Sequence, residues 1–130
     1  EAALKLMCER SLTREAFGRP LAKLGANGDI IAQARIDIEM TRLLCLKAAW
    51  LMDHEGTDAA QPFISMIKVA APNMALKIID EAMQLHGGIG LSQDTPLATW
   101  YGAQRTLRFA DGPDSVHRMV IARRELSQYR

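Results

Sequence analysis

The sequence predicts an all-α fold, an antiparallel helical bundle of about five helices, formed as one domain over residues 1–130. Apolar residues recur at spacings of three and four along most of the chain, which is the period of an amphipathic helix. Runs of β-branched and aromatic residues with the length of a strand are missing, and aromatic residues make up only 5% of the chain. The links between the periodic segments are mostly short, and short links favour antiparallel neighbours in a bundle.

The first two helices are expected on either side of a glycine-containing turn at residues 18–20 and a loop over residues 23–28. Asp29 is expected to cap the second helix, which runs to about Met52. Its apolar residues form two stripes, and together these are wider than one neighbouring helix could cover. We therefore expect this helix to pack against two partners or against another subunit.

The third helix is expected from near Pro62 to the glycines that follow residue 86, which suit the end of a helix. Pro72 lies inside this pattern, and the alternatives are one kinked helix or two shorter helices that meet there. We favour the kink because the apolar period keeps its phase across Pro72. A turn at residues 92–96 leads to a fourth helix that ends near Phe109, and a fifth helix runs from Pro113 to about residue 128.

Composition excludes several classes of function. The formal net charge is +1 and the charges are dispersed, so we expect no nucleic-acid partner. We find no apolar run near the roughly 20 residues that span a bilayer, and no signal peptide, so we expect no membrane span.

Cys8 and Cys45 are expected to be buried free thiols, which indicates a reducing compartment. The first seven residues have the pattern of the middle of a helix, so we expect the chain to be part of a longer protein.

Two kinds of cofactor site are not expected. A di-iron centre in a helical bundle needs two Glu-x-x-His motifs, and the sequence offers only one approximate copy, from Asp114 to His117. We therefore expect no metal site. The glycine-rich residues 84–90 follow a helix and not a strand, so they are not a Rossmann or P-loop turn. Without further information, they are a helix end followed by a loop.

Residues 109–118 interrupt two helical patterns and contain the candidate catalytic group. Gly112 gives the break its backbone freedom, and Pro113 suits the first position of a helix. The carboxylate of Asp111 would then lie just ahead of a helix N-terminus, flanked by Phe109 and an alanine. An ionised carboxylate in apolar surroundings is typical of a general base. The alternative is that Asp111 and Asp114 only cap the helix.

Three motifs together resemble one family. They are Arg-Glu-Ala-Phe-Gly-Arg-Pro-Leu at residues 14–21, Gln-Leu-His-Gly-Gly-Ile-Gly at residues 84–90, and Phe-Ala-Asp-Gly-Pro-Asp-Ser-Val-His-Arg at residues 109–118. In this order and spacing they resemble the C-terminal helical domain of the acyl-CoA dehydrogenases. The Asp-Gly-Pro-Asp form is most similar to the subgroup of family members ten and eleven, because most of the family has Glu-Gly-Thr there.

The resemblance implies an FAD-dependent oxidation of an acyl-CoA thioester to the trans-2-enoyl-CoA, with Asp111 as the catalytic base. It implies substrate contacts for Gly112 and Arg123. The resemblance also implies that a neighbouring subunit holds part of the FAD. The residues of this chain that it places near FAD are Arg14, Phe17, Gln84, Gly87, Gly88, Pro113 and Ser115.

The resemblance also implies a homodimer or homotetramer and an electron-transfer flavoprotein as electron acceptor. The compartment would be the cytoplasm in a bacterium, and otherwise the mitochondrion or peroxisome. Gly25, Gly102, Pro113 and Ser115 depart from the usual family residues, and each change removes a polar contact, so FAD contacts are expected to differ in detail. Two alternatives stay open, an acyl-CoA oxidase and a non-enzymatic helical oligomerisation module.

Overall fold

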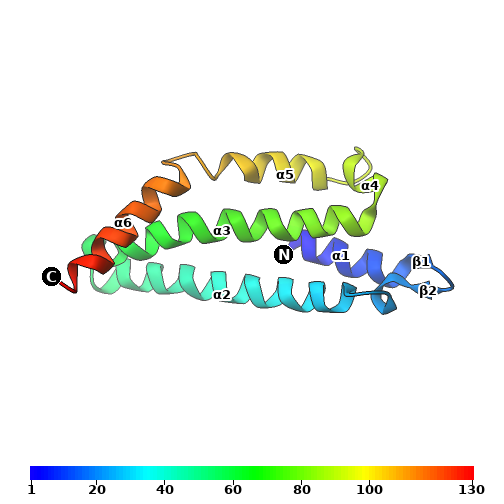
Figure 1. Cartoon of the computed structure of the whole chain (residues 1–130), viewed down its shortest axis with the longest axis horizontal. Helices are drawn as coiled ribbons and strands as arrows, with labels where there is room; N and C mark the ends of the chain where they lie inside the picture. The colour runs from blue at the N-terminus through cyan, green and yellow to red at the C-terminus, as the bar shows by residue number, and fades with distance from the viewer.

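The computed structural model describes residues 1–130 and contains six α-helices and one small hairpin (Figure 1). In chain order the elements are α1 Ala2–Thr13, β1 Glu15–Ala16, β2 Arg19–Pro20, the 3₁₀ turn η1 Leu21–Lys23, α2 Asn27–His54, α3 Thr57–His86, α4 Gly88–Leu91, α5 Leu97–Thr106 and α6 Asp114–Ser127. The predicted all-α class is confirmed. The five expected helices are α1, α2, α3, α5 and α6, and the four-residue α4 is additional.

The long helix α3 is the centre of the bundle. It packs against α1, α2, α5 and α6, and α2 lies beside it over most of its length (Figure 1). It continues through Pro62 and Pro72, so one helix forms here and not two. By length and composition alone α3 could cross a membrane, with a mean hydropathy of 1.3 over its most apolar window. Its position between four other helices accounts for the same composition, because a central helix is apolar on several sides.

The core lies where α1, α2, α3 and α5 meet. Met7 of α1 and Leu97 of α5 are fully buried, and the other core residues are aliphatic, namely Ala3, Leu4, Ala34, Ile38, Ile78, Ile79 and Ala82. Burying such side chains supplies about 1.5–3 kcal/mol each for the larger ones. The core thus fixes α1 and α5 on α3 and determines where their ends lie.

Several predicted boundaries differ from the structure. Helix α2 begins at Asn27, so Asp29 lies inside its first turn and does not cap it. The side-chain amide of Asn27 instead donates to the carbonyl of Leu21, at 2.8 Å, and closes the loop before the helix. Helix α3 begins at Thr57, five residues before Pro62. Helix α5 ends at Thr106, because successive turns occupy residues 107–112.

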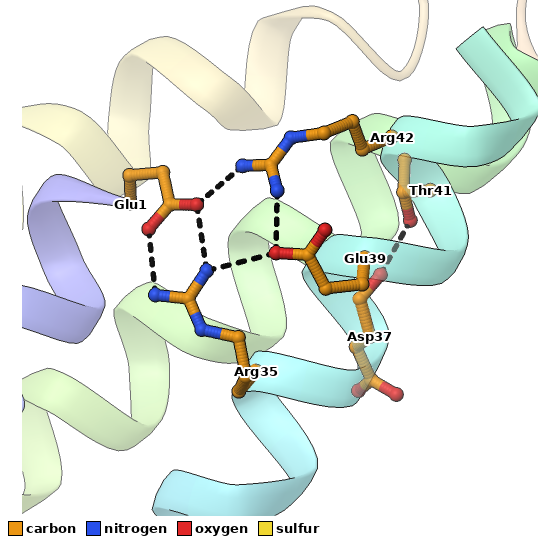
Figure 2. Close-up of polar contacts among 6 residues, drawn as sticks. All are labelled: Glu1, Arg35, Asp37, Glu39, Thr41 and Arg42. Atoms are coloured by element: carbon orange, nitrogen blue, oxygen red, sulfur yellow. Dashed lines mark hydrogen bonds and ion pairs between the residues drawn. The ribbon is translucent and has the colours of Figure 1, made fainter. Parts of the chain in front are cut away.

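An exposed charge cluster joins the start of α1 to α2 (Figure 2). The Glu1 carboxylate accepts hydrogen bonds from Arg35, at 2.8 and 2.9 Å, and from Arg42. Both arginines also donate to Glu39. The hydrogen bonds from Arg35 and Arg42 lower the pKa of Glu1 to about 2. Since each charge in the cluster already has an opposite partner, it connects two helices and offers no free group for chemistry.

One face of α2 is apolar and exposed. Its side chains are between 47% and 65% exposed and recur every three or four residues, at Ile36, Met40, Leu43, Leu46 and Trp50. The opposite face is the buried one, with Ala34, Ile38, Ala48 and Leu51. The chain itself therefore covers one apolar face of α2 and leaves another in contact with solvent, although these faces do not coincide residue by residue with the two predicted stripes.

Candidate functional site

The first group of predicted site residues lines a groove at the end of α3. Arg14, Gln84, Gly87 and Gly88 all border an open space of about 740 Å³, together with Arg10, Leu21, Asn27, Leu85, His86 and Ile89. Arg14 reaches it because α1 stops at Thr13 and the chain becomes extended at the next residue. Gly87 reaches it because α3 ends there, with φ at +64°, a conformation that favours glycine.

The groove carries the donors that an anion needs. Two arginines border it, and each guanidinium can hold two oxygens of a phosphate in a fork. The Nε atom of Arg10 is buried and has no hydrogen-bond partner within the chain. A buried donor without a partner is costly, so an acceptor from outside the chain fits this place. The set of residues is compatible with the diphosphate of a dinucleotide such as FAD.

Phe17 does not line this groove. It lies at the tip of the β1–β2 hairpin with φ at +51°, and its side chain is 95% exposed. The hairpin pairs Ala16 with Arg19 and leaves Phe17 and Gly18 as its two-residue loop. A left-handed conformation is uncommon for a phenylalanine, and here the two-residue hairpin loop imposes it.

The second group of predicted residues lies in the turn between α5 and α6. Asp111 has φ at +52° and Gly112 has φ at +98°, so two successive residues are left-handed. Two side chains hold this backbone. Lys68 of α3 donates to the carbonyls of Leu107, at 2.7 Å, and of Gly112, at 3.1 Å. His117 Nε2 lies 3.1 Å from the carbonyl oxygen of Asp111.

The surroundings of Asp111 differ from the prediction. Its side chain is exposed and makes no hydrogen bond or ion pair, and Phe109 beside it is 57% exposed. Within this chain the carboxylate therefore does not lie in apolar surroundings, because the turn is at the outer edge of the bundle. Helix α6 also begins later than expected, with Pro113 as its N-cap, so Asp111 lies two residues before the cap. The carboxylate is free to accept a proton.

Asp114 is the buried carboxylate of this region. It is only 8% exposed, and its Oδ2 accepts from Arg108, at 2.8 Å, and from Asn73, at 3.2 Å. Burial raises the pKa of Asp114, but the hydrogen bonds from Asn73 and Arg108, with the charges of Arg108 and Arg118, outweigh burial and lower the pKa below its usual value. Asp114 makes no side-chain capping bond, so its expected role as a cap is wrong.

Pro113 and Ser115 line a different groove from the first group. This groove has a volume of about 550 Å³, and its other residues are Arg105, Arg108, Phe109, Asp114 and Arg118. The groove has a net positive charge, because three arginines and only one aspartate line it. Arg123 lies nine residues into α6, about two and a half turns after its start, and its exposed side chain makes no hydrogen bond. The structure therefore does not bring Arg123 to Asp111.

The two groups of site residues are far apart along α3. Lys68 holds the turn of Asp111, and Gln84 borders the first groove, so 16 residues separate the two places on one helix. At 1.5 Å per residue this is about 24 Å. One chain thus presents two separate sets of residues, and the structure does not unite them in one pocket.

Sequence reasoning did not identify Arg10, Ser65, Lys68, Asn73 or His117 as site residues. Four of them act through contacts that join positions 39–52 residues apart, so no local pattern reveals them. His117 was present in a motif, but its spacing gave no indication that its ring would reach the carbonyl of Asp111. Arg10 was the exception, because it lies one helical turn before Arg14 and so on the same side of α1.

No group of three or more His, Cys, Asp or Glu side chains is close enough to hold a metal ion. The family model for the C-terminal domain of acyl-CoA dehydrogenases matches residues 1–126.

Individual relatives agree with this match. The chain is 52% identical, over 98% of its length, to the probable acyl-CoA dehydrogenase FadE2 of Mycobacterium tuberculosis, and covers 31% of that protein. It is 53% identical, over 97% of its length, to acyl-CoA dehydrogenase family member 11 of Rattus norvegicus, and covers 16% of it. A Mycobacterium abscessus structure assigned as an acyl-CoA dehydrogenase is 57% identical with a TM-score of 0.97, over 98% of this chain and 31% of that one. The chain therefore belongs to the acyl-CoA dehydrogenase family and has the fold of its C-terminal domain.

Proposed function

We propose that the complete protein oxidises an acyl-CoA thioester to the trans-2-enoyl-CoA, and that Asp111 is its catalytic base. The observation that carries this proposal is the state of the Asp111 carboxylate. It makes no hydrogen bond and no ion pair, while the backbone that carries it is held by Lys68 and His117. A group that must accept a proton needs free lone pairs and a fixed position, and Asp111 combines both.

The chemistry assigned to Asp111 is a proton transfer. The thioester carbonyl acidifies the α-carbon, and Asp111 accepts the proton from that carbon as the double bond forms between the α- and β-carbons. FAD, when bound, supplies the acceptor for the hydride that leaves the β-carbon.

Part of the FAD site is assigned to the groove at the end of α3. Arg14, with Arg10 beside it, is suited to the diphosphate, and the backbone of Gly87 and Gly88 permits close approach because these residues have no side chains. Because this groove lies about 24 Å along α3 from the turn of Asp111, the two would serve different parts of FAD or different copies of it. An electron-transfer flavoprotein is the proposed electron acceptor.

The experiment is a substitution of Asp111 by Asn in the complete protein. Asn keeps the size but cannot accept the proton, so flavin bleaching by a saturated acyl-CoA should slow by about 10² to 10⁴-fold in stopped flow. Asp53→Asn, an exposed aspartate on α2, is the matched control and should react like the parent. Equal rates for Asp111→Asn and the parent would show that the base lies elsewhere. Oxygen consumption that keeps pace with turnover would favour an acyl-CoA oxidase.

We also propose that the protein assembles through the exposed apolar face of α2. Five large side chains from Ile36 to Trp50 form a continuous stripe, which is more apolar surface than a monomer usually exposes. Light scattering on the complete protein should give a dimer or tetramer, and Leu43→Glu should shift it toward the monomer. A monomeric parent would remove the basis for this assignment and favour another partner for α2.

A further inference from the structure

We propose that Lys68 and His117 are positioning residues, which hold the Asp111 turn in its left-handed conformation and so aim the candidate base. This inference rests on the proposed function of Asp111. The turn itself needs support, because a left-handed conformation is less favourable for a residue with a side chain than for glycine. Asp111 and Gly112 adopt it in succession, at +52° and +98°.

Lys68 closes one side of the turn. Its ammonium group donates to two carbonyls that lie five residues apart, Leu107 before the turn and Gly112 within it. It has no carboxylate within 4.0 Å, so it makes no ion pair with Asp111. Lys68 is half-buried on α3, and its two backbone acceptors are the partners that its charge has within the chain. The lysine is thus placed to fix the backbone and leave the carboxylate free.

His117 closes the other side. Its Nε2 donates to the carbonyl of Asp111, since a carbonyl oxygen can only accept. Its Nδ1 lies 3.4 Å from the hydroxyl of Ser65, which is itself buried on α3. The ring therefore lies between α3 and the turn and is held at both nitrogens. A side chain on Gly112 would come within 3.2 Å of Nε2, so the ring also packs against the glycine backbone.

These contacts join the turn to the central helix of the bundle. Ser65 and Lys68 are three residues apart and lie on the same side of α3, the central helix. Without them the turn would be connected to the bundle only through its own backbone and through Asp114. A free Asp111 turn would sample right-handed conformations, and the carboxylate would move away from the reacting carbon. A displacement of about 1 Å at a reacting group costs on the order of 10²-fold in rate.

The test uses the complete protein with FAD and a panel of straight-chain saturated acyl-CoA thioesters. Lys68→Met keeps an unbranched side chain, one atom shorter, and removes the donors. His117→Leu replaces the ring by an apolar side chain that has no donor. Each should slow flavin bleaching by about 10- to 100-fold at saturating thioester, with the dissociation constant of the thioester and of FAD changed by less than about threefold. His117→Gln keeps a donor toward the Asp111 carbonyl and should recover most of the rate. Lys5→Met, an exposed lysine on α1, is the control.

The outcomes separate the two proposals. If the parent does not bleach with any thioester, the proposed function fails, and crystal structures of the variants still test the positioning role through the φ angle of Asp111. A left-handed Asp111 in both Lys68→Met and His117→Leu, or bleaching at the parent rate in both, would overturn the positioning role. A rate loss in His117→Gln equal to that in His117→Leu would also overturn it for His117, because the donor would then be irrelevant.

Discussion

The buried ion pair at the start of α6 gives a prediction whose size can be worked out from the structure. Asp114→Asn removes the charge that Arg108 faces at 2.8 Å, in a place where the aspartate side chain is only 12% exposed. Breaking a fully buried pair by removing one partner costs about 3–5 kcal/mol. The Arg108 side chain is 35% exposed, so water can partly replace the lost charge. Asn also keeps an oxygen for the amide of Asn73. We therefore expect a loss of about 2 kcal/mol in the free energy of unfolding.

The assay is urea unfolding at pH 7, followed by circular dichroism. At a denaturant dependence of roughly 2 kcal/mol per molar, a loss of about 2 kcal/mol lowers the midpoint by about 1 M. Asp58→Asn is the matched control, because Asp58 lies in the first turn of α3 as Asp114 lies in the first turn of α6, but it is exposed. That change should cost only the interaction with the helix dipole, about 0.3–1 kcal/mol. Equal midpoints for the two variants would refute the importance of the buried pair.

The pH dependence follows from the direction of the same shift. The pKa of Asp114 is lowered in the folded chain, so its contribution to stability is present above the unfolded value of about 3.9 and is lost as the pH falls through the folded pKa. The difference in stability between the parent and Asp114→Asn should thus be constant from pH 7 to about pH 5. It should shrink below about pH 4, as the parent loses its charge. A difference that grows on acidification would show that the sign is wrong.

Two further predictions concern the groove and the glycines. Arg14→Ala should weaken FAD binding by the complete protein about 10- to 100-fold in a fluorescence titration, because a charge-assisted hydrogen bond contributes about 1.5–3 kcal/mol. The control is Arg19→Ala on the hairpin, which should leave FAD binding unchanged. Unaltered FAD binding in Arg14→Ala would exclude the groove. Gly90→Ala should destabilise the protein by about 1–3 kcal/mol in thermal unfolding, since the new methyl group would come within 2.6 Å of the Met83 carbonyl oxygen. Gly102→Ala, where a methyl group meets no other atom, should stabilise it by about 0.5–1 kcal/mol in the same assay.

The sequence was sufficient to predict the helices, because the apolar periodicity that indicates a helix is a local pattern. Apolar residues at helical spacing predicted α1, α2, α3, α5 and α6, and glycine predicted the end of α3 at Gly87. The ends that were misplaced depend on contacts that no local pattern contains. Asn27 begins α2 because its amide reaches the carbonyl of Leu21, and α5 stops early because the carbonyl of Leu107 is turned toward Lys68. A cap or a turn can be read from neighbours in sequence only when its partners are also neighbours.

In the candidate site, too, local motifs predicted some residues, while residues that act through long-range contacts were missed. Motifs identified the candidate site residues Asp111, Arg14 and Gln84, but not the residues that hold the Asp111 turn. Asp111 and Asp114 look alike in sequence, as two aspartates on either side of Gly-Pro. The structure separates them, because one is exposed and unpartnered and the other is buried against Arg108 and Asn73. Burial depends on how α6 packs on α3, so local sequence alone could not show which of the two aspartates is buried.

The place where α3 holds the turn is also a place where a proline interrupts the hydrogen bonds of that helix. Pro72 has no N–H, so the carbonyl of Lys68, four residues earlier, loses its usual helical donor. Beside it, the side-chain amide of Asn73 donates both to the carbonyl of Val69, at 2.7 Å, and to Asp114. The contacts to the Asp111 turn thus come from Lys68 on one side of the proline and Asn73 on the other. Because the Asn73 side chain bonds both to the backbone of α3 and to Asp114 after the turn, the conformation of this region and the hydrogen bonding of the central helix are linked through Asn73.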